Sequence, residues 1–153
     1  MFFSFDDRHS AAGTRRQLGI GAKERRCSAE AERCFNQALE IWISVGDRRS
    51  IAGTYGELGD VVYLESRSKE AEGHYRTALD PFLAFDDRHG AARAFHQLGV
   101  VSQDQRRLEQ AEGHYRNALG IFLTFTDRYG AGIVLHSFAR LRKEATWEPC
   151  QRQ

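Results

Sequence analysis

A short motif returns every 40 residues along this chain, with no insertion between its copies. The motif reads FDDRH at 5–9, VGDRR at 45–49, FDDRH at 85–89 and FTDRY at 125–129. A fixed period of this length is typical of repeat proteins, because each unit is one supersecondary element that buries its apolar face only against its neighbours. The sequence therefore predicts a repeat array.

Alignment at this period divides the chain into three full repeat units and part of a fourth. The full units are predicted at 7–46, 47–86 and 87–126. The fourth keeps the frame of a first helix over 127–142, and residues 143–153 are predicted to be a divergent C-terminal tail. Residues 1–6 align with the end of a second helix, so they are predicted to be the end of a truncated preceding helix.

Each repeat unit is predicted to contain two helices and no strand. In the second unit, apolar residues follow three- and four-residue spacing, which places each set on one helical face. The two sets are Ile51, Tyr55, Leu58 and Val62, and then Ala71, Tyr75, Ala78 and Phe82. Asp47, Asp87 and Asp127 are predicted to cap the first helices, and Ser28 and Ser68 are predicted to cap second helices.

The order of small and large residues within a unit narrows the fold further. It runs through Tyr55, Leu58, Gly59, Ala71, Tyr75 and Ala78, and again through Phe95, Leu98, Gly99, Ala111, Tyr115 and Ala118. This order resembles the tetratricopeptide repeat signature over about residues 5 to 141. The longer period resembles bacterial multi-repeat proteins and is similar to kinesin light chain arrays. The resemblance implies an all-α fold, a right-handed α-solenoid of antiparallel helix pairs with about seven helices.

Three further features of the sequence generate expectations about its geometry. Arg26, Ser66 and Arg106 stand in the turn between helices where the family usually has glycine, so each is strained if that turn needs positive φ. Pro81 lies inside a predicted second helix, and a bend is expected over 78–81. The glycine of each Leu-Gly pair is expected to allow close approach of the second helix, since a helical glycine otherwise costs about 1 kcal/mol relative to alanine.

Composition and motif content exclude several function classes. The chain has 22 basic and 21 acidic residues and a net charge of +1, so neither nucleic acid nor an anionic membrane is expected as a partner. Three cysteines without a paired spacing favour reduced thiols and a cytoplasmic location. No catalytic motif is present, so no enzyme activity and no cofactor are expected. His96 and His136 share one repeat position, which is weak evidence for a metal site.

The resemblance also implies where a ligand would bind. In tetratricopeptide arrays the first helices of successive repeats line a concave groove, and the groove positions of this chain are mixed with a basic lean. The predicted groove residues are Arg16, Asp60, Tyr63, Arg93, His96, Gln103, His136 and Arg140. We therefore expect a non-catalytic protein-interaction scaffold that binds a peptide or protein segment in this groove, as part of a regulatory protein.

The alternative function is structural, namely an array that self-associates through uncapped ends into a homo-oligomer. The partial fourth unit leaves Phe138 and Leu141 without a following helix to cover them, which would expose an apolar end. Three explanations stay open at this level: Trp147 folds back over the end, two chains pair there, or the chain is a fragment of a longer array.

Overall fold

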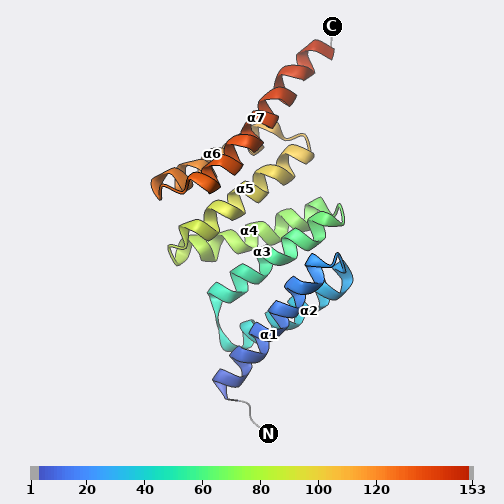
Figure 1. Ribbon diagram of the computed structural model, residues 1–153, viewed down its shortest axis with the longest axis vertical. Coiled ribbons are helices and arrows are strands. Elements are labelled where there is room, and N and C mark those ends of the chain that lie inside the picture. The colour runs from blue at the N-terminus through green and yellow to red at the C-terminus, as the bar shows by residue number, and fades with distance from the viewer. Residues whose placement is uncertain (1–3, 152–153) are drawn as a thin grey trace. The chain divides into compact units, whose positions relative to one another are not determined.

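The computed structural model describes residues 4–151, and the side chains of residues 4–146. All secondary structure in this part of the chain is helical (Figure 1). The helices are α1 (Phe5–Glu24), α2 (Ser28–Val45), α3 (Arg48–Leu64), α4 (Ser68–Ala84), α5 (Arg88–Asp104), α6 (Leu108–Thr124) and α7 (Arg128–Gln151). The predicted all-α class is confirmed. Over the described residues, no helix combines the length and apolarity that a membrane span requires.

The helices form two compact bodies, which we call the N-terminal body (Met1–Phe85) and the C-terminal body (Asp86–Gln153). In the N-terminal body, α1 pairs with α2 and α3 with α4, while α2 also packs on α3 and α1 contacts α3. In the C-terminal body, α6 packs against both α5 and α7, and α5 contacts α7. Within each body the first helices of neighbouring repeats therefore lie side by side.

Small residues on the second helices and an aromatic ring between them form the core of each helix pair. The alanines Ala31, Ala38, Ala71, Ala78, Ala111 and Ala118 are all fully buried. The rings of Phe35, Tyr75 and Tyr115 lie against the glycines of the Leu-Gly pairs. A Cβ atom built on Gly19 would lie 2.7 Å from the Phe35 ring, and one built on Gly59 would lie 2.5 Å from the Tyr75 ring. The close approach expected at these glycines is confirmed, and it is made by an aromatic side chain.

Gly59→Ala should therefore lower the free energy of unfolding by about 2 kcal/mol, because the added methyl group would displace a buried, packed ring. Thermal or urea unfolding measures the change. Gly73→Ala is the matched control: Gly73 is exposed in α4 and has no neighbour within 4 Å of a built Cβ, so alanine should raise helix stability by about 0.5–1 kcal/mol. Equal effects of the two substitutions would contradict this packing account.

The turns between helices hold their residues in the left-handed region. Within repeats, Arg26, Ser66 and Arg106 have φ of 60°, 60° and 62°. Between repeats, the equivalent residues are Gly46, Asp86 and Thr126, with φ of 75°, 54° and 55°. The strain expected at the three non-glycine residues within repeats is confirmed, and Thr126 is the most unfavourable of the six because it is β-branched.

Thr126→Gly should raise the free energy of unfolding by about 1 kcal/mol, since glycine adopts this φ without steric strain. The reverse exchange at the equivalent turn, Gly46→Thr, should lower it by about 1–2 kcal/mol. Both positions are exposed, so packing contributes little to either change. Urea unfolding of the two variants measures both changes. A higher free energy of unfolding for Gly46→Thr would contradict the left-handed conformation of residue 46.

Helix caps agree with the sequence in the first helices and differ in the second helices. The side chains of Asp47, Asp87 and Asp127 accept hydrogen bonds from the amide three residues later, at 2.9–3.0 Å, as predicted. The predicted caps Ser28 and Ser68 are wrong. The cap positions are occupied by Cys27 and Arg67, without a side-chain hydrogen bond, because the left-handed residue before each reverses the chain one residue earlier.

The ends of the described chain also differ from expectation. Helix α1 begins at Phe5, where Ser4 and Asp7 form a reciprocal capping box, so residues 4–6 start a helix instead of ending one; residues 1–3 lie outside the description. Helix α7 continues past Arg142 to Gln151, and the side chain of Trp147 lies outside the described residues. Helix α4 runs through Pro81, and the bend there stays a prediction.

Candidate ligand-binding site

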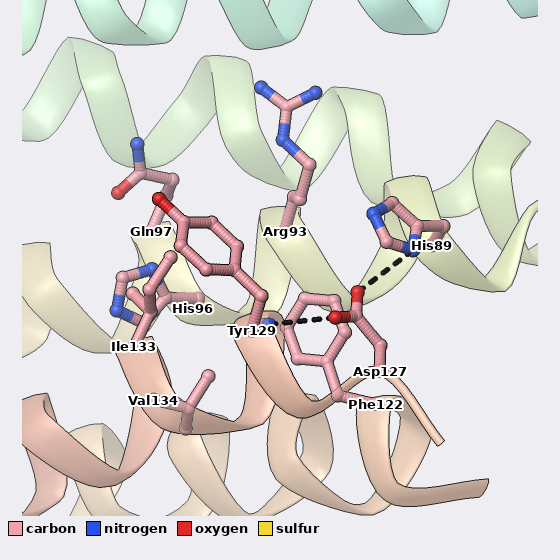
Figure 2. Close-up of a pocket in the computed structure, with 10 residues that line it drawn as sticks. His89, Arg93, His96, Gln97, Phe122, Asp127, Tyr129, Ile133 and Val134 are labelled. Carbon is pink, nitrogen blue, oxygen red and sulfur yellow. Dashed lines mark hydrogen bonds and ion pairs between the residues drawn. The ribbon is translucent and has the colours of Figure 1, made fainter. Parts of the chain in front are cut away.

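A pocket of about 210 Å³ lies between α5 and α7 in the C-terminal body (Figure 2). Its walls come from adjacent first helices, and α6 closes it from below. The lining residues are His89, Arg93, His96, Gln97, Phe122, Asp127, Tyr129, Gly130, Ile133 and Val134. Two of the predicted groove residues, Arg93 and His96, are among them.

The floor of the pocket is apolar and its rim is polar. Phe122 of α6 and Val134 of α7 are buried and provide the floor. At the rim, the Tyr129 side chain of α7 is 82% exposed and Ile133 is 42% exposed, which is unusual for residues of this size. Figure 2 shows the Tyr129 side chain extending from α7 toward Gln97 of α5, and the Arg93 side chain projecting from α5. An aromatic ring and a guanidinium group are thus among the groups that line the pocket.

One end of the pocket is formed by His89 and Asp127. Nδ1 of His89 lies 3.6 Å from Oδ2 of Asp127, and the His89 ring meets the Phe122 ring edge-on with centroids 5.4 Å apart. The other oxygen of Asp127 accepts the Gly130 amide at 2.9 Å, which caps α7. The carboxylate of Asp127 is therefore engaged by the helix end and by His89.

The inner wall carries a histidine that burial keeps neutral. Nε2 of His96 lies 2.9 Å from the hydroxyl oxygen of Ser137, and its ring lies 5.8 Å from the Tyr115 ring. Burial lowers the pKa of His96, because the imidazolium ion loses solvation there. His96 therefore supplies hydrogen bonding to the pocket at neutral pH and no charge.

Arg93 supplies the unbalanced charge of the pocket. Its side chain is exposed on α5 and makes no hydrogen bond or ion pair with any residue that the structure describes. Asp127 lies at the other end of the pocket, beside His89 and the Gly130 amide, so Arg93 is the cation at the mouth that no described carboxylate pairs with. An anionic group beside an apolar group is the ligand chemistry that this arrangement accepts.

The equivalent place in the N-terminal body is filled by the protein itself. Arg16 of α1 holds the repeat position of His96, and Gly53 of α3 holds that of Ile133. The Arg16 side chain lies over Gly53, with the Nη2 atom of Arg16 3.4 Å from a Cβ atom built on that glycine. Arg16 also approaches Glu57 at 3.9 Å. Lys23 lies 2.6 Å from Glu57 and 3.4 Å from Asp60. These charges are therefore engaged with one another within α1 and α3.

The pKa values in this cluster reflect its internal pairing. Burial acts to lower the pKa of Lys23, but the hydrogen bond and charge of Glu57 and the charge of Asp60 outweigh it, so the pKa is raised. The Tyr75 hydroxyl donates to Asp60 at 2.7 Å, and burial together with this carboxylate raises the pKa of Tyr75. Arg16 and Asp60, both predicted groove residues, thus contribute to internal structure here.

The remaining predicted groove residues lie in three different environments. Tyr63 is half-buried near the end of α3. Gln103 is only 5% exposed: it accepts the Tyr115 hydroxyl and donates to Glu144, each at 2.8 Å, and so links three helices. His136 and Arg140 are exposed on α7 outside the pocket. Among the described residues, no three His, Cys, Asp or Glu side chains cluster in a way that could hold a metal ion.

Sequence reasoning overlooked most of the pocket. From the sequence, His89 and Tyr129 are only parts of the repeat motif, Asp127 is a predicted helix cap, and Phe122 carries no predicted role in a site. Tyr129 did carry a signal, because positions 9, 49 and 89 of the same motif hold His, Arg and His. A basic residue that becomes an aromatic one in a single repeat is the kind of departure that marks a ligand contact.

Comparisons with known proteins agree with this architecture. Residues 10–80 match the family model of the tetratricopeptide repeat. No curated protein sequence matches the chain. The apo form of RapI is similar in structure, with a TM-score of 0.85 and 13% identity over 92% of this chain and 39% of that one. The Rap conjugation gene regulator of plasmid pLS20, solved with the Phr* peptide, is also similar in structure, with a TM-score of 0.76. Its sequence identity is 16%, and the match covers 86% of this chain and 37% of that one.

A third similar structure is the N-terminal domain of stress-induced protein-1 from C. elegans, with a TM-score of 0.68 and 20% identity over 84% of this chain and 95% of that domain. The chain spans about two fifths of the length of the two Rap structures. At these identities the similarities establish the fold, and they confirm the predicted solenoid of helix pairs.

The lowered pKa of His96 predicts a pH dependence of stability. In the unfolded chain the His96 imidazole takes up a proton at about pH 6.5, whereas in the folded protein burial lowers the pKa of His96. The neutral form of His96 therefore contributes to the free energy of unfolding above pH 6.5, and this contribution is lost as the pH falls through the folded pKa. His96→Gln should reduce this loss in urea unfolding curves at pH 7.5 and 5.5. His136→Gln, at the same position of the next repeat, measures what removal of an exposed histidine does. If the free energy of unfolding changed equally between pH 7.5 and pH 5.5 in His96→Gln and His136→Gln, the result would contradict the burial of His96.

Proposed function

Because the chain is a tetratricopeptide repeat protein, we propose that it is a non-catalytic interaction module that holds an acidic polypeptide segment against α5 and α7. The observation that carries this proposal is Arg93, an exposed cation without a partner among the described residues, beside an apolar pocket. Helical repeats offer an extended surface, and a few exposed side chains on it provide the chemistry of recognition.

The dimensions and composition of the pocket define the segment. A space of about 210 Å³ suits one large apolar side chain, which would rest on Phe122 and Val134. Tyr129 and Ile133 would cover that side chain from the rim, and a neighbouring carboxylate would bind Arg93 with charge-assisted hydrogen bonds. Aromatic residues and arginine are the side chains that contribute most to binding at such anchors.

The segment would continue along one face of α7. Tyr129, Ile133, His136 and Arg140 follow three- and four-residue spacing, and all four are exposed. His136 and Arg140 thus extend the basic rim beyond the pocket, which favours a ligand with more than one acidic residue. This is where the predicted groove residues of α7 would act.

A regulatory role is consistent with the comparisons. The conjugation gene regulator of similar fold was solved with a bound peptide. We propose that this chain likewise acts within a regulatory protein, where occupancy of the α5–α7 face by a peptide or a protein segment would be the signal. The proposal concerns binding alone, and no residue of the pocket is assigned to catalysis.

The alternative function, self-association, is favoured by a different observation. Leu135 is 53% exposed on α7, at the repeat position that Phe95 packs into the core in the preceding unit. Light scattering over a range of concentrations separates the two functions. A mass that rises with concentration and falls back in Leu135→Lys would support assembly, whereas a constant mass would remove this alternative.

Binding can be tested without a known partner. Selection from a random 12-residue peptide library on the purified chain should enrich sequences with Asp or Glu next to a large apolar residue. Arg93→Glu should weaken the selected peptides at least tenfold in fluorescence anisotropy, and Tyr129→Ala about threefold to tenfold. Exchange of the peptide carboxylate for lysine should restore binding to Arg93→Glu.

Arg33→Glu is the matched control, since Arg33 is an exposed arginine of α2 that lies outside the pocket. It should change affinity less than twofold. Selected peptides that bind Arg93→Glu and Tyr129→Ala as tightly as the wild type would exclude this site. A selection without any acidic preference would contradict the proposed ligand class.

A further inference from the structure

The contacts of His96 in the α5–α7 pocket determine which of its ring nitrogens carries the proton. Nε2 of His96 lies 2.9 Å from Oγ of Ser137, and the same Ser137 hydroxyl donates to the carbonyl oxygen of Ile133, 3.3 Å away. A hydroxyl group has one proton, and a serine inside a helix commonly donates it to the carbonyl four residues earlier. The Ser137 oxygen therefore accepts from His96, which places the imidazole proton on Nε2.

Nδ1 of His96 is consequently a hydrogen-bond acceptor. Burial lowers the pKa of His96, so the ring is neutral at pH 7.5, and in a neutral imidazole one nitrogen donates and the other accepts. No described residue donates a hydrogen bond to Nδ1. Nε2 is turned toward Ser137, which is not part of the pocket lining, whereas His96 is part of it (Figure 2). Nδ1 is therefore the ring nitrogen that is left for a ligand.

The same pair of positions has a different chemistry in the N-terminal body. Arg16 of α1 holds the repeat position of His96. Its neighbour at 3.9 Å is Glu57 of α3, which holds the repeat position of Ser137. Arginine has donors only, and its side chain there lies over Gly53. Histidine at this position thus provides the C-terminal body with an open space and with an acceptor in the wall of that space.

A purely apolar side chain does not satisfy this wall. Inside the pocket it would keep water from Nδ1 of His96 and leave a buried acceptor without a partner, which disfavours the complex. The side chain that enters the pocket therefore needs an N–H or O–H donor on an otherwise apolar body. Tryptophan and tyrosine are the large side chains with this combination.

Three features of the pocket favour the indole group of tryptophan over the phenol group of tyrosine. The indole nitrogen is a donor only, which matches an acceptor, whereas a phenol oxygen also has acceptor lone pairs to satisfy. Phe122 and Tyr129 provide aromatic partners for a second ring. Arg93 provides a cation, and tryptophan is the aromatic side chain that interacts most strongly with cations.

We propose that the α5–α7 pocket selects a tryptophan side chain, whose indole N–H donates to Nδ1 of His96 while the ring rests on Phe122. This inference rests on the proposed function, because it identifies the residue of the acidic segment that enters the pocket. The ligand is then an acidic segment that contains tryptophan, with a neighbouring carboxylate on Arg93. Ser137 is a positioning residue, because its hydroxyl group holds the imidazole in the required tautomer.

The tautomer can be measured without a ligand. In the intact chain labelled with ¹⁵N-histidine, NMR at pH 7.5 should show a protonated Nε2 and an unprotonated Nδ1 for His96, and His96→Gln assigns the signals by removing them. Ser137→Ala should move part of the proton to Nδ1, because Nε2 loses its acceptor. A proton that resides on Nδ1 in the wild-type chain would overturn the inference.

The peptide selection tests the side chain itself. Among the 12-residue peptides selected on the purified chain, those whose binding depends on Arg93 should carry tryptophan beside the acidic residue. If they carry another large apolar residue instead, the tryptophan is overturned and the proposed function stands. If no selected peptide depends on Arg93, the proposed function fails, and this inference fails with it.

A matched pair of peptides isolates the indole N–H group. The tightest selected tryptophan peptide is compared with the same peptide carrying 3-benzothienylalanine, in which sulfur replaces the N–H group. Fluorescence anisotropy should show at least fivefold tighter binding of the tryptophan peptide. His96→Gln should bring the two affinities within about twofold of each other, since glutamine can keep the bond to Ser137 and has no acceptor at the place of Nδ1.

His74→Gln is the control for removal of a half-buried histidine, since His74 of α4 lies outside the pocket. It should keep the full preference for the tryptophan peptide. Equal affinities of the two peptides for the wild-type chain would overturn the inference, and so would a preference that persists in His96→Gln. In either case, a loss of both affinities in Arg93→Glu would still support the acidic segment of the proposed function.

Discussion

The contact between an aromatic ring and a helical glycine determines the geometry of every helix pair here. Glycine inside a helix costs about 1 kcal/mol relative to alanine, and the chain accepts this cost at the same position of three repeats. In return, the rings of Phe35, Tyr75 and Tyr115 lie directly on the backbone of the first helix. This contact fixes the rotation of the first helix about its axis, and with it the set of residues that faces outward. Arg93 and His96 face the pocket because Gly99 faces the ring.

Function in such an array depends on how repeats differ at equivalent positions. Arg16 and His96 occupy the same place in two repeats, as do Gly53 and Ile133. In the N-terminal body the long arginine crosses to the glycine and closes the space, and its neighbours Glu57, Asp60 and Lys23 satisfy one another. In the C-terminal body the shorter histidine bonds to Ser137 and leaves a pocket open. The same backbone thus carries a space filled by side chains in one body and an open pocket in the other.

The same reasoning separates the proposed binding surface from the structural turns. Among residues 4–151, five non-glycine residues adopt positive φ at the helix ends. The aspartate caps that follow the turns between repeats offset part of this strain. These turns are needed by the scaffold itself. Arg93 is an exposed cation with no hydrogen bond or ion pair to any described residue, which is why it is assigned to a ligand and not to stability.

The sequence by itself determined the period, the two helices in each repeat, the aspartate caps and the role of the Leu-Gly glycines, because all of these depend on spacing within a few residues of the chain. It also predicted Arg93 and His96 as groove residues, and both of them line the α5–α7 pocket. Only the tertiary structure decided that Gln103 is buried, that α1 begins with a Ser4 cap and that Tyr129, Phe122 and Asp127 share a pocket. Burial and cavities depend on side-chain size and direction across helices about 40 residues apart, and local periodicity does not encode how two such side chains fill the space between them.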